Sequence, residues 1–211
     1  LRQAIDRLPD AGAMEELRQR CGQPLACRIA GKERALPLAP VTPELLRGIL
    51  EQATQRSAYA MQEMTRCGFV TLPGGHRLGF CGTAVVQNGT ITALREPSSL
   101  NLRIARQPDG IADRLRDALW ARPQSVLLCG APGCGKTTLL RNLIRQLSDR
   151  FGWRICVVDE RLELAACASG VPQFRLGAHT DVLSGAPKAA GIELLLRTMN
   201  PEWIAVDEIT A

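Results

Sequence analysis

The chain has 211 residues, which is enough for one large domain or two modest ones. Its formal net charge of +5 comes mostly from arginine; it is compatible with nucleic acid or acidic lipid as a partner and establishes neither. No apolar run is long enough to span a bilayer, and the eight cysteines lack the C-x-x-C spacing of a zinc site, which favours a reducing compartment.

Residues 1–106 are predicted to form an N-terminal α+β domain built on an antiparallel sheet. Residues 1 to about 20 have a helical pattern, whereas 24–30 and 33–39 are typical of two short strands joined by Gly31-Lys32. A helix is expected after Thr42, its N-cap, and a second one from Ser57 to Cys67. Short strands follow over 68–72, 77–81, 83–87 and 90–94, and residues 97–107 are expected to lead to the second domain.

Residues 107–211 alternate helices with apolar strands, which indicates an α/β core with a mainly parallel, doubly wound sheet. Buried strands are expected at 126–129, 154–159 and 203–207. Helices are expected at 109–122, directly after Gly135, and at 192–199. The helix after Gly135 should place its leucines on one face and Arg141 and Arg145 on the other.

The most informative stretch runs from Gly130 to Thr137 and matches the phosphate-binding pattern G-x-x-x-x-G-K-[ST], between an apolar strand and a helix. Glycines allow backbone N–H groups to surround a polyphosphate, and the helix N-terminus adds a partial positive charge. Lys136 is expected to reach the β- and γ-phosphates and Thr137 to ligate Mg²⁺. The alternative is a glycine-rich turn without a ligand. We predict a nucleotide site made by Gly130, Ala131, Pro132, Gly133, Cys134, Gly135, Lys136, Thr137 and Thr138.

Two apolar strands end in Asp-Glu pairs, Asp159-Glu160 and Asp207-Glu208. In a phosphate-loop enzyme one such aspartate holds Mg²⁺ and an adjacent glutamate polarises the attacking water. Additional-strand ATPases place a strand between the loop strand and the metal-binding strand, so we assign Asp207 to Mg²⁺ and Glu208 to water activation. Asp159, Glu160 and Glu163 form an auxiliary acidic box, and the predicted catalytic residues are Lys136, Glu208 and Glu160. The alternative is that Asp159 and Glu160 only cap a strand and pair with Arg161 or Arg154.

Motifs along nearly the whole chain resemble the stage III sporulation protein AA family of endospore-forming bacteria, relatives of type II and type IV secretion ATPases. The resemblance includes the phosphate loop with Leu139-Leu140-Arg141, and Val158-Asp159-Glu160-Arg161 after the next strand. It also covers residues 57–60 (S-A-Y-A), 74–77 (G-G-H-R), 101–106 (N-L-R-I-A-R), 170–173 (G-V-P-Q), 180–183 (T-D-V-L) and 200–208 (N-P-E-W-I-A-V-D-E).

The resemblance implies a Mg²⁺-dependent ATPase with a RecA-like P-loop core, which hydrolyses ATP with water and without a covalent intermediate. It also implies a hexameric ring in the cytoplasm of the mother cell, peripherally associated with a membrane through channel proteins of the sporulation complex. Arginines near the domain junction would help to neutralise the phosphates, and the candidates are Arg95, Arg103 and Arg106.

The chain departs from the family pattern at two places. His179 stands where an arginine is expected before Thr180-Asp181, in what we interpret as a loop. The sequence also ends at Ala211, soon after the metal-binding strand, so the core is expected to be truncated there and to hydrolyse ATP poorly.

Two other functions compete with a secretion-type ATPase. A RecA-like motor on single-stranded nucleic acid fits the basic balance, although the few aromatic residues are not clustered into a stacking platform. A nucleotide-gated assembly scaffold would bind ATP and barely turn it over, which Glu208 argues against. A GTPase is disfavoured because the sequence contains no N-K-x-D guanine-reading motif.

Overall fold

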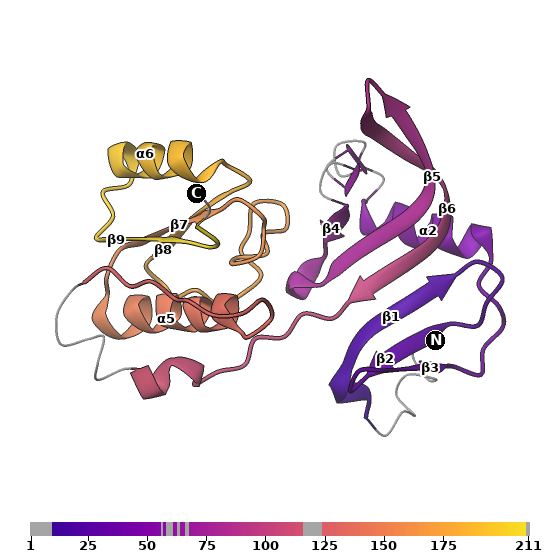
Figure 1. Ribbon diagram of the computed structural model, residues 1–211, viewed down its shortest axis with the longest axis horizontal. Helices are drawn as coiled ribbons and strands as arrows, with labels where there is room; N and C mark the ends of the chain where they lie inside the picture. The colour runs from indigo at the N-terminus through magenta and orange to yellow at the C-terminus, as the bar shows by residue number, and fades with distance from the viewer. Residues whose placement is uncertain are drawn as a thin grey trace. The chain divides into compact units, whose positions relative to one another are not determined.

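The computed structural model describes residues 10–55, 57, 61, 62, 64, 65, 68–115 and 124–209. The chain divides into two compact units, Leu1–Ala105 and Arg106–Ala211. The first contains an antiparallel sheet, and the second contains parallel strands between helices (Figure 1). In the part of the chain that the structure describes, no helix is both long and apolar enough to cross a membrane.

The first unit is built on a six-stranded sheet in the order β3-β2-β1-β6-β5-β4, in which all neighbouring strands are antiparallel. This arrangement agrees with the antiparallel sheet predicted for the N-terminal domain, including the hairpin at Gly31. The elements are η1 (Ala11–Ala13), β1 (Met14–Arg20), β2 (Ala26–Ile29), β3 (Lys32–Ala35), β4 (Phe69–Thr71), η2 (Pro73–Gly75), β5 (Arg77–Gln87) and β6 (Thr90–Arg103).

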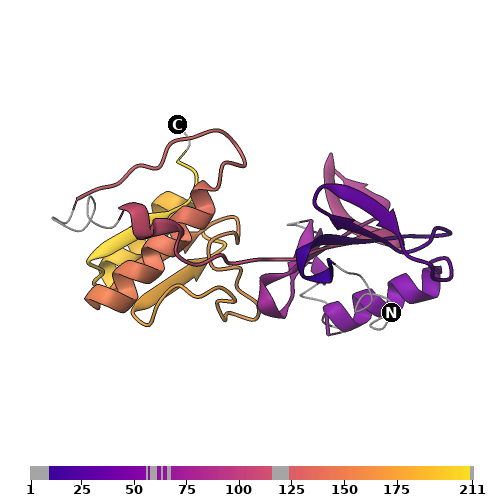
Figure 2. The same cartoon turned by 90° about the horizontal axis from the view of Figure 1, so that it is seen from below.

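The helix α2 (Pro43–Ala53) lies along one face of this sheet (Figure 2). It begins as predicted, because Thr42 Oγ1 accepts a hydrogen bond from the Leu45 N–H at 3.3 Å. The second predicted helix, from Ser57 to Cys67, lies largely outside the described residues. The apolar face of α2 packs against β5 and β6 in a cluster that contains Leu46, Leu50, Leu78, Phe80 and Leu100.

Residues 14–20 were predicted to be helical and form the strand β1 instead. Both edges of β1 are paired, one with β2 and the other with β6. Leu17 and Gln19 are buried on one face, and a register shift at Glu15 brings Met14 inward as well. Glutamate, glutamine, leucine and arginine favour helices in isolation, but two hydrogen-bonded ladders outweigh that propensity. Residues 1–9 of the predicted helix lie outside the described residues.

The strand β6 extends through Arg103, so much of the predicted connection at 97–107 belongs to the sheet. The cause is a bulge: Cys81 pairs with Ser99 and Thr83 with Arg95, so residues 96–98 all lie opposite Gly82. A Cβ atom at Gly82 would lie 2.2 Å from the Arg95 carbonyl oxygen, so the bulge requires glycine. Pro97 therefore marks an irregularity within a strand, where proline is tolerated, and not the end of the strand.

The second unit contains a parallel three-stranded sheet in the order β8-β7-β9. The elements are β7 (Ile155–Asp159), β8 (Thr180–Ser184) and β9 (Trp203–Val206), with the helices α5 (Lys136–Phe151) and α6 (Lys188–Thr198) on opposite faces (Figure 1). Ile144 of α5 packs against Val157 of β7, and Leu195 of α6 packs against Val158 on the other face. The predicted α/β layering and parallel pairing are therefore present.

Two details of this sheet differ from the prediction. Residues 126–129 were expected to form a buried strand, but the structure places them outside any strand, with Val126 and Leu127 exposed. Apolar side chains alone do not make a strand, because its backbone also needs a neighbouring ladder, and no described strand pairs with this segment. Conversely, residues 179–181 were interpreted as a loop, but Thr180 and Asp181 belong to β8, an edge strand whose polar residues gave no alternating signal.

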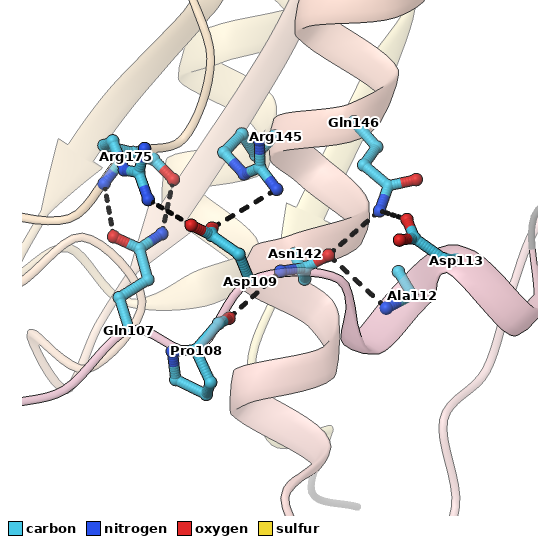
Figure 3. Close-up of polar contacts among 9 residues, drawn as sticks. All are labelled: Gln107, Pro108, Asp109, Ala112, Asp113, Asn142, Arg145, Gln146 and Arg175. Atoms are coloured by element: carbon cyan, nitrogen blue, oxygen red, sulfur yellow. Dashed lines mark hydrogen bonds and ion pairs between the residues drawn. The ribbon is translucent and has the colours of Figure 1, made fainter.

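The segment that leads into the second unit is attached to α5 by buried amide groups (Figure 3). The carbonyl oxygen of the buried Asn142 side chain accepts hydrogen bonds from Gln146 Nε2 at 3.0 Å and from the Ala112 N–H at 3.4 Å. Its Nδ2 donates to the Pro108 carbonyl oxygen at 3.2 Å, and Gln146 Nε2 also donates to Asp113 Oδ1 at 2.7 Å. This segment contains η3 (Ile111–Leu115); residues 116–122 of the helix predicted there lie outside the described residues.

The same segment is attached a second time through Arg175 (Figure 3). The Gln107 side chain donates to the Arg175 carbonyl oxygen at 2.7 Å and accepts from the Arg175 N–H at 2.8 Å. The Arg175 guanidinium pairs with Asp109 at 2.6 Å, and Arg145 lies 3.4 Å from the other oxygen of that carboxylate. Residues 107–113 therefore belong structurally to the second unit.

We expect Asn142→Ala to lower the free energy of unfolding of the second unit by about 2 kcal/mol, because buried hydrogen-bond partners would be left unsatisfied. Urea unfolding followed by tryptophan fluorescence measures this, since Trp120, Trp153 and Trp203 all belong to that unit. Arg150→Ala, at an exposed position of the same helix, is the matched control and should change stability by about 0.5 kcal/mol or less. Equal effects of both substitutions would contradict the attachment described here.

Candidate functional site

The segment from Gly130 to Gly135 depends on glycine at three positions. Gly133 and Gly135 have φ angles of +74° and +96°, in the left-handed region. A Cβ atom on Gly130 would lie 2.7 Å from Cys134 Sγ. Gly135 is the N-cap of α5, and glycine has no side chain that could accept hydrogen bonds from the first N–H groups of the helix. The N-terminus of α5 therefore follows the glycine-rich turn directly. This is the backbone arrangement that binds anions.

Lys136, the first residue of α5, folds back along this turn. Its Nζ donates to the carbonyl oxygens of Gly130 and Ala131, both at 2.9 Å, and lies 4.0 Å from Cys134 Sγ. These contacts hold the ammonium group within the turn, beside the helix N-terminus. Two sources of positive potential therefore coincide, which suits a polyphosphate.

Thr137 and Asp207 are brought together although they are far apart in the sequence. Thr137 lies in the first turn of α5, and Asp207 directly follows β9, at the carboxyl end of the parallel sheet. Thr137 Oγ1 donates a hydrogen bond to Asp207 Oδ2 at 2.9 Å. The two residues that the sequence predicted as metal ligands thus lie in direct contact.

The oxygen donors present here fit a bound Mg²⁺. Magnesium prefers hard oxygen ligands and, beside a nucleotide, is held by one or two protein oxygens together with phosphates and water. Thr137 and Asp207 offer one hydroxyl and one carboxylate at the edge of the phosphate-loop segment. Both side chains are half-buried, so they are accessible to such an ion.

Glu208 follows Asp207 immediately and has a φ angle of +51°, which is unusual for a residue with a side chain. Its backbone N–H donates to Asp207 Oδ1 at 3.1 Å. Its carboxylate forms an ion pair with Arg161, which comes from the turn after β7. The predicted catalytic glutamate is therefore next to the predicted metal ligand and contacts an arginine.

Asp159 differs from the expected acidic-box residue. It is fully buried, and its carboxylate accepts three backbone N–H groups: Glu163 at 2.7 Å, Leu164 at 3.1 Å and Ala165 at 2.8 Å. These bonds fix the chain that leaves β7, which corresponds to the capping alternative considered from the sequence. Glu163, the third residue of the predicted acidic box, takes part in these bonds through its backbone N–H.

Glu160 is held by a different partner from the arginines that the sequence suggested. Its carboxylate forms an ion pair with Lys188, the first residue of α6. A catalytic role for Glu160 stays a prediction. No sequence motif predicted the ion pairs of Lys188 and Arg161, because these pairs form only where the fold brings separate segments together.

Arg141 was expected on the outer face of α5 and is buried instead. Its guanidinium donates to the carbonyl oxygens of Leu164 and Glu163, each at 2.8 Å, and lies 4.0 Å above the ring of Phe174. Asp159 thus binds the N–H groups of residues 163–165, and Arg141 binds the C=O groups of residues 163 and 164. An arginine inside the helical repeat gives no sequence signal for such a role.

Two of the predicted arginines, Arg95 and Arg103, belong to the first unit. Arg103 approaches Glu16 at 3.7 Å within the first unit, and Arg95 is exposed there. The roles proposed for Arg95, Arg103 and Arg106 stay predictions. His179 precedes β8 and donates its N–H to Ser148 Oγ at 2.7 Å. Thr180 pairs with Ile155 at the start of β7, so His179 lies at the amino end of the sheet, opposite Asp207.

Comparisons with known proteins place the sequence in a family. A family model described as "Sporulation stage III, protein AA" matches residues 1–211. Stage III sporulation protein AA of Bacillus subtilis (strain 168) is 38% identical over 216 residues, covering 99% of this chain and 70% of that protein. Protein SEEDLING PLASTID DEVELOPMENT 1 of Arabidopsis thaliana is 38% identical over 120 residues, covering 52% of this chain and 16% of that protein.

Solved structures share the fold at low sequence identity. The pilus retraction motor PilT with bound ADP has a TM-score of 0.63 and 18% identity, covering 100% of this chain and 59% of that one. The ATPase DotB of Legionella pneumophila has a TM-score of 0.55 and 16% identity, covering 96% of this chain and 57% of that one. The chain therefore shares an α/β fold with these two proteins and spans less than two thirds of the length of either one.

Proposed function

The chain belongs to the family of sporulation stage III protein AA, and from this membership and the site geometry we propose that it is a Mg²⁺-dependent ATPase of the secretion type. The observation that carries the proposal is the hydrogen bond of 2.9 Å between Thr137 and Asp207. It joins the residue after the phosphate-loop lysine to the acid after β9, which are the two protein groups such enzymes use for the metal. The shared fold with the ATPase DotB supports the same reading.

In this proposal, the backbone N–H groups of residues 130–138 other than Pro132 bind the triphosphate of ATP, and the Lys136 ammonium neutralises its charge. Thr137 Oγ1 and an Asp207 carboxylate oxygen hold the metal. Bound Mg²⁺ supplies further neutralisation of the phosphate oxygens. Glu208 orients the attacking water and accepts its proton on a carboxylate oxygen, with no covalent intermediate on the protein. Glu160, which follows the neighbouring strand β7, is proposed as a further catalytic carboxylate.

We propose further that the protein works as a hexameric ring in the mother-cell cytoplasm, and that channel proteins of the sporulation complex attach it to a membrane. The similarity to secretion ATPases and the sporulation family support these assignments. In a ring, arginines from a neighbouring subunit can approach the phosphates, and Arg95, Arg103 and Arg106 are the candidates. A ring that couples ATP hydrolysis to movement would energise transport or assembly.

Hydrolysis of MgATP by the full-length protein tests this function. We expect turnover per chain to rise with protein concentration, because a ring must assemble, and to be insensitive to single-stranded DNA. Glu208→Gln should lower kcat by roughly 10² to 10⁴-fold and leave MgATP binding intact, since it removes the proton acceptor and its ion pair with Arg161 but no group assigned to the phosphates or the metal. Glu202→Gln, just before β9 at the other end of that strand, is the matched control.

Two outcomes would contradict the proposal. Strong stimulation by single-stranded DNA would favour a nucleic-acid motor. Turnover unchanged by Glu208→Gln would mean that another group accepts the proton.

A further inference from the structure

The ion pair between Arg161 and Glu208 connects the ends of the neighbouring parallel strands β7 and β9. Both side chains are largely exposed, at 59% and 42% of their reference areas. An ion pair this exposed to solvent adds little to stability, so stability does not explain the contact. It does bring a guanidinium onto the carboxylate next to the proposed metal ligand Asp207.

The backbone that carries Arg161 is fixed from several sides. Arg161 lies in a turn in which the Leu162 N–H donates to the Asp159 carbonyl oxygen at 3.4 Å. Directly after the turn, the buried Asp159 carboxylate binds three backbone N–H groups, and the buried Arg141 binds two carbonyl oxygens. The guanidinium therefore extends from a turn that is hydrogen-bonded on both sides.

Charges around the turn direct Arg161 toward Glu208. The adjacent Glu160 would compete for the guanidinium, but its carboxylate is paired with Lys188 from α6. Glu208 itself lies beyond the end of β9 in a left-handed conformation, and its N–H donates to the side chain of the preceding residue. A cation from the turn after β7 thus meets the carboxylate that follows β9.

We propose that Arg161 is a positioning residue that holds the Glu208 carboxylate in place to accept the proton of the attacking water. This inference rests on the proposed ATPase function. A charge-assisted bond to one carboxylate oxygen restricts the glutamate side chain and leaves its other oxygen available to water.

The structure provides a closely matched control for this pair. Arg154 and Glu202 form a second exposed ion pair at 3.8 Å, at the opposite ends of the same two strands, with exposures of 54% and 42%. This second pair lies at the end of β9 opposite Asp207, so its loss should not affect the groups proposed to bind nucleotide and metal. Because Arg154 Nε also donates to the Asn200 carbonyl oxygen at 3.1 Å, any general effect of losing an arginine–glutamate pair between β7 and β9 should be at least as large at Arg154.

The test compares Arg161→Gln, Arg161→Lys and Arg154→Gln in the full-length protein. We expect Arg161→Gln to lower kcat roughly tenfold to a hundredfold with KM and MgATP affinity changed less than about twofold, because only the base is misplaced. Arg161→Lys should recover part of the loss, and Arg154→Gln should match the wild type. Hydrogen exchange of the nucleotide-free protein gives an activity-independent reading: residues 207–209 should exchange faster in Arg161→Gln.

The outcomes separate this inference from the proposed function. If the wild type hydrolyses MgATP and Arg161→Gln has an equal or higher kcat, the positioning role is wrong. The same holds if Arg154→Gln loses as much activity as Arg161→Gln, or if exchange at 207–209 is unchanged. If the wild type shows no hydrolysis although exchange at 207–209 responds as expected, the ATPase proposal has failed and the positioning role fails with it, leaving the ion pair as structural.

Discussion

Lys136→Ala should abolish the stabilisation of the second unit by MgATP. A ligand that binds only the folded state at one hundred times its Kd stabilises a protein by about 2.7 kcal/mol, and we expect the wild type to gain about this much. The variant should gain almost nothing, because the ammonium held within the turn of residues 130–135 supplies the charge that balances the phosphates. Thermal unfolding with and without MgATP, followed by tryptophan fluorescence, measures the difference.

The control for this experiment is Lys32→Ala. Lys32 is exposed on β3 in the first unit, so its replacement removes the same charge elsewhere in the chain. Lys32→Ala should retain the full MgATP-dependent stabilisation. An MgATP response in Lys136→Ala equal to that of the wild type would contradict the assignment of the phosphate loop.

Asp159→Ala should give the largest loss of stability among the residues near the site, about 3 to 5 kcal/mol in the free energy of unfolding. Three backbone N–H groups would lose their acceptor, two of them on buried residues, and each buried group left without a partner costs about 1 to 3 kcal/mol. Urea unfolding followed by tryptophan fluorescence measures the change. Asp181→Ala, which removes an exposed carboxylate from the neighbouring strand β8, should change stability by about 0.5 kcal/mol or less.

This prediction also separates two roles for the acids after β7. If Asp159→Ala left stability unchanged and reduced only hydrolysis, Asp159 would be part of an acidic box at the site, and the capping role would be wrong. A folded but destabilised protein that still binds MgATP would agree with the geometry.

The sequence was sufficient for the features that depend on local chemistry. The glycine pattern at 130–135 predicted a backbone turn before α5, with which the positive φ angles of Gly133 and Gly135 agree, and apolar runs predicted β7 and β9. The two Asp-Glu pairs were correctly placed at the ends of β7 and β9, which are parallel and therefore end at the same edge of the sheet. Thr137 and Asp207, both assigned to the metal from the sequence, lie in contact.

The features that the sequence did not predict depend on pairing between distant segments. Residues 14–20 have helix-favouring side chains and become a strand because β2 and β6 both pair with them. Residues 126–129 are apolar enough for a strand but have no described partner ladder. Arg141, Arg161 and Lys188 gain their roles from contacts with Glu163, Glu208 and Glu160, which no spacing in the sequence encodes.

The central claim, that nucleotide phosphates bind in the turn of residues 130–135, is tested most directly by alkylation of Cys134. Cys134 is exposed in that turn, and Cys21 and Cys81 are exposed in the first unit as internal controls. Burial raises the pKa of the Cys156 thiol, with the charge of Asp181 adding to it, and burial also raises that of Cys167, so both should react slowly.

With MgATP at ten times its Kd, about one chain in eleven is free, so the alkylation rate of Cys134 should fall about tenfold while Cys21 and Cys81 react as before. Mass spectrometry of the separate peptides measures each rate. An unchanged rate at Cys134, at MgATP concentrations up to the millimolar range, would contradict nucleotide binding at this loop.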